Sequence, residues 1–330
     1  MGAGAADEIT SRVEDLSFVW TRPRDHVEIF GFKGAPSDHH PAVLASMGQS
    51  PQEALVIGIG AVSLAAFILA GLCQLLRISR VWRVLLVPGV FLAAYFMAYG
   101  KVPSFPPVGA VNKIFYIALL GAVLGLIVDL AGKPRLASFL LALQPVATAL
   151  YIGEARLRTA PIEVLGAAAA GFAAMWLLRR HMEVSTGEEA MRRALVLAIA
   201  AFGFAPLALL GASSASLQLC LIFGFAVLAT LVWNLRNDDY AFGTSSLLGG
   251  AGGMVAVVFA VTLITRKTDL VALAVLSLIF LVPALGNRLP WVATRKGKVV
   301  RLVAFALFCA VPAFCAMAIA ILSYGSSFPI

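Results

Sequence analysis

Ten apolar stretches, each close to the length of a membrane span, constrain the fold of this chain more than any other feature. A helix needs about 20 apolar residues to cross ~30 Å of hydrocarbon. Backbone groups in lipid must be hydrogen-bonded within the segment, so such stretches form helices. We therefore predict an all-α, polytopic integral membrane bundle of about ten transmembrane helices. The predicted spans are 54–76, 82–99, 112–130, 136–153, 161–178, 193–212, 215–235, 244–264, 269–287 and 301–323.

Composition and charge divide the chain into two predicted parts. Of the 330 residues, 61% are hydrophobic and 13% are charged, whereas soluble domains have about 25% charged residues. Residues 1–53 carry eight acids and four bases and form a predicted polar, partly ordered N-terminal tail. Residues 54–330 form the predicted transmembrane domain. Its positive charge lies in loops and at span ends, which is typical of topology signals and lipid headgroup attraction and not of nucleic-acid binding.

The longest hydrophilic interruption after the tail, residues 179–193, fixes the predicted orientation. With ten spans, 15 lysines and arginines lie on the side of this loop and six lie in the loops of the opposite side. Loops rich in lysine and arginine remain in the cytoplasm. The pattern predicts a multi-pass protein of the cell (inner) membrane, with loop 179–193 in the cytoplasm and both termini outside it.

Several predicted helices begin with recognisable local chemistry. Thr186 and Glu189 form a capping box that opens the sixth helix, and Pro161 suits the first turn of the fifth. Thr268 and Asp269 are candidates to cap the ninth span. The three prolines within 101–113 predict a stiff, non-helical connection. Residues 211–216 are the only break between the sixth and seventh spans.

The most polar feature predicted near the middle of a span is Gln144-Pro145, with Thr148 one turn later. Proline removes a backbone hydrogen bond and leaves a carbonyl without its usual donor, and a glutamine amide can bind a solute. Broken helices at a common depth form the binding sites of many transporters. Gln144, Pro145 and Thr148 are therefore candidate substrate-binding residues, with helix packing as the alternative. Further prolines occur at predicted membrane depth, at Pro88, Pro206 and Pro312.

Signals for catalysis, cofactors and metals are weak, and we predict no catalytic residue, no cofactor and no metal site. The four cysteines lie in apolar stretches without histidine neighbours and are expected to act as small hydrophobic side chains. Asn234 and Asp238 have the spacing of a magnesium–diphosphate motif, but Phe242 replaces its next acid. His39-His40 lacks further ligands.

Small residues four positions apart predict close contacts between helices. They account for packing inside the bundle, and they leave open a homodimer or a membrane-protein partner that binds through such faces. The pairs are Gly121 with Gly125, Ala167 with Gly171, and Gly249 with Gly253.

Three functions follow from these patterns and remain open. The first is a transporter or permease for a small uncharged or amphiphilic solute. The second is a non-catalytic subunit or assembly factor of a larger membrane complex, and the third is a lipid-modifying enzyme. In length and number of spans the chain resembles the drug/metabolite transporter superfamily. That resemblance is one of hydropathy, because the two halves show no matching duplication and the usual orientation of the superfamily is the reverse.

Overall fold

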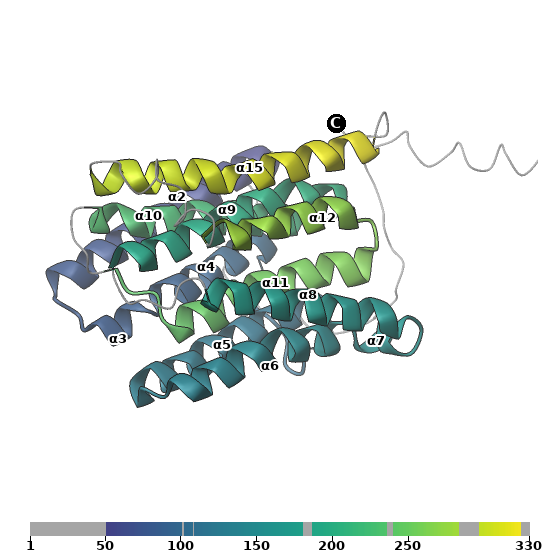
Figure 1. Ribbon diagram of the computed structural model, residues 1–330, viewed down its shortest axis with the longest axis horizontal. Coiled ribbons are helices and arrows are strands. Elements are labelled where there is room, and N and C mark those ends of the chain that lie inside the picture. Colours follow the sequence, from purple (N-terminus) through teal and green to yellow (C-terminus); the bar gives the residue numbers. More distant parts are fainter. Residues whose placement is uncertain are drawn as a thin grey trace, which may run out of the picture. The chain divides into compact units, whose positions relative to one another are not determined.

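The computed structural model describes residues 51–100, 102–107, 109–180, 187–235, 240–283 and 297–324. All regular secondary structure in these ranges is helical, and the longer helices run side by side (Figure 1). The predicted N-terminal tail lies outside the described residues, apart from its last three positions.

Nine helices in the described ranges are long and apolar enough to cross a membrane, and they correspond to nine of the ten predicted spans. Two of them include short non-α segments, which are 3-10 (η1) or π-helical (η2 and η3). The nine comprise α2 (Pro51–Leu75), α3 (Arg80–Arg83) with α4 (Leu86–Tyr99), α5 (Ala110–Ala131), α6 (Pro134–Ile152), α8 (Pro161–Arg180), α9 (Gly187–Leu210), α10 (Ser214–Leu231) with η1 (Val232–Asn234), η2 (Ser246–Ala251) with α11 (Gly252–Ala260) and η3 (Val261–Thr265), and α15 (Lys298–Tyr324).

The tenth predicted span, 269–287, is described in part. It contains α12 (Leu270–Ser277) and the 3-10 segment η4 (Leu278–Leu281), which together form a shorter apolar helix. The chain enters this helix at the end of the bundle where the Tyr324 hydroxyl donates to the Lys267 carbonyl. It enters α15 at the opposite end, where Lys298 bonds the carbonyl of Asn234. The chain therefore crosses the bundle between Lys267 and Lys298.

Hydrogen bonds between helix ends show that successive helices alternate in direction. At one end, the Tyr324 hydroxyl donates to the Leu210 carbonyl over 2.9 Å, and Tyr99 bonds Ser216 over 3.3 Å. At the other end, the Arg179 guanidinium donates to the carbonyl of Pro134 over 3.3 Å. Figure 1 shows α3 at one end of the bundle and α7 (Glu154–Leu157) at the opposite end.

Local chemistry sets helix starts largely as predicted. Asp269 is the N-cap of α12 and accepts hydrogen bonds from the backbone N–H groups of Val271 and Ala272. Pro161 begins α8. Helix α9 begins at Gly187, the position after the predicted capping residue and six residues before the apolar span that starts at 193. The predicted capping residue Thr186 lies outside the described residues.

The predicted connections between α4 and α5 and between α9 and α10 are also present. Residues 102–107 have no helix, and the Tyr116 hydroxyl of α5 donates to the Pro103 carbonyl over 3.2 Å. Helices α9 and α10 are separate, because Ala212 adopts a left-handed conformation (φ 59°) that ends the helical path.

The segment η2–α11–η3 lies at the centre of the bundle. In its most apolar 18 residues, 72% of the residues are buried, whereas the same fraction is 22% in α2 and in α15. Asp129 of α5 binds the first turn of this segment. Its carboxylate accepts hydrogen bonds from the backbone N–H groups of Thr244 and Ser245, each over 2.9 Å. A carboxylate there satisfies helix donors that otherwise lack partners and complements the helix dipole. The Ser245 and Ser246 hydroxyls donate to carbonyls of α5 and of the turn before α4.

Candidate functional site

Gln144 lies in the middle of α6 and faces the central segment. Its side-chain Nε2 donates to the carbonyl oxygen of Leu248 over 2.8 Å. Leu248 belongs to the π-helix η2, whose hydrogen-bond pattern differs from that of an α-helix and which recurs at functional sites. The Oε1 atom of Gln144 is buried and accepts no hydrogen bond from any residue that the structure describes. This polar contact lies among apolar helices and carries no formal charge.

Two glycines allow the close approach of the chain around Gln144-Pro145. A Cβ atom on Gly252 of α11 would lie 1.7 Å from Gln144 Nε2. A Cβ atom on Gly171 of α8 would lie 3.1 Å from the Pro145 Cβ and 2.6 Å from the ring of Phe259. The α6 residues therefore meet α8 and α11 at their glycines.

Thr148 and Pro145 are both buried, with Thr148 2% exposed. All three predicted substrate-binding residues thus lie on inward parts of α6. Their role in binding a solute stays a prediction. The chemistry available is that of an uncharged amide, whose donor is bound to a backbone carbonyl and whose buried acceptor has no described partner.

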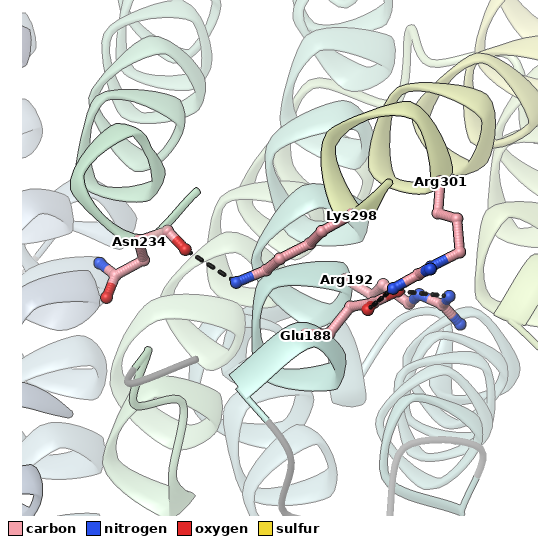
Figure 2. A network of polar contacts seen from close by, with 5 residues as sticks. All are labelled: Glu188, Arg192, Asn234, Lys298 and Arg301. Carbon is pink, nitrogen blue, oxygen red and sulfur yellow. Dashed lines mark hydrogen bonds and ion pairs between the residues drawn. The ribbon is translucent and has the colours of Figure 1, made fainter. Parts of the chain in front are cut away.

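A second polar site lies where α9, α10 and α15 end or begin together (Figure 2). The Glu188 carboxylate bridges two guanidinium groups. Its Oε1 accepts from Arg192 over 2.9 Å and from the Nε of Arg301 over 3.1 Å, and its Oε2 accepts from Arg301 over 2.6 Å. The Lys298 ammonium donates to the Asn234 carbonyl over 2.8 Å, where it complements the negative end of α10.

The Asn234 side chain serves helix contacts in this structure. Its Oδ1 accepts from Gln74 of α2 over 2.8 Å, and its Nδ2 donates to the Thr230 carbonyl over 3.3 Å. Phe242 is buried, and Asp238 lies outside the described residues. Among the described residues, no group of three or more His, Cys, Asp or Glu side chains could hold a metal ion.

Ion pairs at the opposite end of the bundle involve Lys113 and Arg266, two of the six bases that the sequence places on the side opposite to loop 179–193. The buried Lys113 ammonium donates to the Tyr151 carbonyl over 2.7 Å and pairs with Glu154 over 3.1 Å. Arg266 pairs with Glu163. These contacts fasten the start of α5 to the end of α6, and the end of η3 to the start of α8.

The predicted small-residue pairs face the chain's own helices. The glycines of α5 lie against the backbone of η2, with Gly121 next to Leu248 and Gly125 next to Ser245. Gly249 lies against Ala122 and Pro88. Packing inside the bundle thus accounts for this spacing, and a homodimer or membrane partner stays a prediction.

Sequence patterns indicate some of these contacts and miss others. The spacing of Glu188 and Arg192, four residues apart on a helix, is a recognisable pairing pattern. Nothing in the sequence pairs Glu188 with Arg301, or Gln144 with Leu248, because each partner lies more than 100 residues away along the chain.

Comparison with protein-family models, with curated proteins and with solved structures finds no match for this chain.

Proposed function

We propose that the chain is an integral membrane protein that crosses the bilayer ten times and acts as a permease for a small uncharged or amphiphilic solute. Membrane insertion is supported by nine described helices of spanning length and by large apolar side chains that the fold leaves exposed. Lipid removes such side chains from water. Examples from α2, α5 and α15 are Leu64, Leu120 and Leu307, each at least 59% exposed.

One observation carries the choice of a permease. A glutamine amide in the middle of α6 bonds a π-helical carbonyl of the most buried helix, and its own acceptor is buried without a described partner. Polar groups inside a membrane protein, set against irregular helical backbone, are how transporters bind solutes. The absence of charge at Gln144 favours an uncharged solute that carries an N–H or O–H donor.

The orientation belongs to the same proposal. Arginines and lysines of α9 and the first turn of α15 share one end of the bundle with the end of α2, which α3 follows, because hydrogen bonds join the ends of α2, α9, η1 and α15. An excess of bases marks the cytoplasmic side. We place that end in the cytoplasm, in the inner membrane of the cell, and the end that carries Tyr324 outside it.

Flux measurements test the permease. The purified chain is reconstituted into lipid vesicles, and osmotic swelling is followed by light scattering in glycerol, urea or acetamide. We expect faster swelling than in protein-free vesicles for at least one of these solutes. Gln144→Leu should slow that flux roughly tenfold, the effect of one lost hydrogen bond of ~1.4 kcal/mol.

Gln218→Leu is the matched control, because it makes the same chemical change in the first turns of α10, far along the chain from α6. Its flux should equal that of the unmodified chain. Flux at the protein-free rate for all three solutes, or equal flux for Gln144→Leu and the unmodified chain, would contradict the proposal.

A non-catalytic membrane subunit is the second candidate, and the tight centre of the bundle favours it. Gly121 and Gly125 lie so close to the backbone of the central segment that a Cβ atom on either would lie within 2.5 Å of it. A subunit would show no solute flux and would co-purify with a partner in fixed stoichiometry after mild extraction from its native membrane. The vesicle measurement therefore separates the two functions.

A further inference from the structure

Residues 102–107, which we call the strap, join α4 to α5 and hold two large apolar side chains away from the bundle. Val102 and Phe105 are 82% and 83% exposed. The strap has no helix and contains no charged residue. Side chains of this kind gain free energy wherever an apolar medium replaces the water around them.

Contacts with α5 fix the position of the strap. The Tyr116 hydroxyl donates to the carbonyl of the buried Pro103 over 3.2 Å. The Tyr116 ring also packs against the Phe105 ring, with the two centroids 5.8 Å apart. The Asn112 amide donates to the Ser104 hydroxyl over 2.8 Å. Phe105 therefore has a defined place beside the first turns of α5.

The strap lies on the outward face of α5. At about 100° per residue, Asn112 lies within about 40° of Tyr116 around the helix axis. The same arc contains four large apolar side chains, each 48–59% exposed: Leu120, Val123, Ile127 and Leu130. In the proposed membrane protein this face meets lipid, and Tyr116 marks the end of the face where α5 begins.

Aromatic rings continue this surface to neighbouring helices. The exposed Phe96 of α4 contacts Phe115 with ring centroids 5.3 Å apart, and Phe115 contacts Tyr116 at 5.5 Å. Tyr151, near the end of α6, is also exposed at this end of the bundle. Tyrosines gather at the level of the lipid headgroups, where the ring is apolar and the hydroxyl reaches water. The strap therefore lies at the depth of the headgroup boundary.

The backbone of the strap suits that depth. Three of its six residues are prolines, Pro103, Pro106 and Pro107, which have no N–H group. An N–H group without a partner is costly in an apolar medium. Irregular backbone exposed to lipid is excluded from the hydrocarbon core itself. The boundary between headgroups and acyl chains is thus the part of a bilayer that this segment fits.

We propose that the strap is an interfacial anchor, whose Val102 and Phe105 side chains insert between lipids at the boundary of headgroups and acyl chains. The anchor rests on the proposed membrane insertion but not on solute transport. It lies on the side of the bilayer where α5 begins, so it adds a membrane contact without adding a span. Its ligand is the lipid surface and not one particular headgroup.

Spin labels measure the depth of the strap. The four native cysteines are replaced by alanine, and one label is attached through Phe105→Cys, Arg158→Cys or Leu120→Cys. Arg158 is an exposed residue after α7 at the same end of the bundle, and Leu120 lies on the lipid face of α5. Each chain is reconstituted into phosphatidylcholine vesicles, and collisions of the label with a water-soluble nickel chelate and with oxygen are measured.

We expect the label at Phe105 to collide with the chelate about threefold less often than the label at Arg158, because apolar anchors are buried below the headgroups. Its accessibility should lie between those of Arg158 and Leu120. Equal collision rates at Phe105 and Arg158 would overturn the anchor. A label at Leu120 that meets the chelate as often as the one at Arg158 would instead overturn membrane insertion.

A second label site shows whether Phe105 holds the strap in the membrane. With the label attached through Val102→Cys, Phe105→Ser should raise collisions with the chelate about threefold, since anchoring scales with buried apolar area. Ile162→Ser is the matched control, because Ile162 is 84% exposed in the first turn of α8 at the same end of the bundle. It should leave the label at Val102 unchanged. Equal collision rates in the Phe105→Ser and Ile162→Ser chains would overturn the proposal.

Discussion

Single residues decide how closely the helices around Gln144 can approach. Gly252 has no Cβ atom, which would overlap the Gln144 amide. The Gln144 Nε2 atom can therefore lie within hydrogen-bonding distance of the Leu248 carbonyl. A glycine inside a helix normally costs about 0.5–1 kcal/mol relative to alanine. At this position the cost is offset by the contact that the glycine permits.

Gly252→Ala should therefore destabilise the bundle by about 2–3 kcal/mol, because it adds atoms to a filled space and displaces a hydrogen-bonded amide. Thermal unfolding in detergent measures the effect. Gln144→Ala in the same chain should recover most of the loss, since it removes the side chain that the new methyl group meets.

Gly60→Ala provides the matched comparison. Gly60 lies on the exposed face of α2, and nothing lies within 4 Å of the position that its Cβ would occupy. The substitution should leave stability unchanged or raise it by several tenths of a kcal/mol. If Gly252→Ala behaved like Gly60→Ala, or if Gln144→Ala did not rescue it, the proposed contact would not hold the helices together.

Residue-level prediction from the sequence reached Gln144 but not its partner. A polar side chain in an apolar stretch is visible in the sequence, and so is the proline beside it. The acceptor is a backbone carbonyl, which every residue has, so no residue type identifies Leu248. The choice depends on which helices pack together, and hydropathy does not determine that.

At the scale of one element, Asp269 both caps the start of the short helix α12 and contacts the neighbouring helix α15. Asp269 receives the N–H groups of Val271 and Ala272, over 2.8 and 3.1 Å. A hydrogen bond from the Ser323 hydroxyl near the end of α15 is the main cause that lowers the pKa of Asp269 below its ordinary 3.8, and the two N–H groups lower it further. The ionised carboxylate therefore joins α12 to α15.

Asp269→Ala should lower stability at pH 7 by about 1 kcal/mol, as expected for a lost N-cap. Because the pKa is depressed in the folded state, the carboxylate contributes its full stabilisation above pH 3.8 and loses it as the pH falls through the folded-state pKa. The difference in Tm between the two chains should shrink below pH 3.8. Asp269→Asn, which retains an acceptor, should lose much less at pH 7, and a pH-independent difference would contradict this role.

The positions of most elements follow from the sequence, because about 20 apolar residues in a row specify a membrane-length helix whatever its neighbours. The internal breaks do not follow. The π-helical segment η2 lies where glycines pack closely against α4, α5 and α6, and that packing depends on residues far away in the chain. The start of α9 at Gly187, before its apolar stretch, agrees in position with the predicted capping box of Thr186 and Glu189.

At the scale of the whole molecule, the two ends of the bundle have different chemistry. One end has the charged side chains of Figure 2 and three exposed tryptophans, Trp82, Trp176 and Trp233. The other has tyrosines bonded to backbone carbonyls, among them Tyr116 and Tyr324. The segregation of bases that predicted the orientation is thus a property of helix ends that lie together in space.

Tag accessibility tests this arrangement. A tag after Ile330, one inserted into 102–107 and one inserted into 181–186 are compared in intact and permeabilised cells. The first two should be accessible in intact cells, because hydrogen bonds place the neighbouring helix ends together. The third should need permeabilisation. Opposite accessibility of the first two tags would contradict the alternation of helices, whereas reversal of all three would contradict only the orientation.

The bond between Asp129 and the start of η2 has a consequence for the order in which the chain is assembled. The donors at Thr244 and Ser245 are synthesised more than 100 residues after their acceptor. In the proposed membrane protein, α5 and α6 would therefore lie in the bilayer with their glycine and glutamine surface uncovered until this later segment leaves the ribosome. The most buried helix of the bundle would then be added after the helices against which its glycines pack.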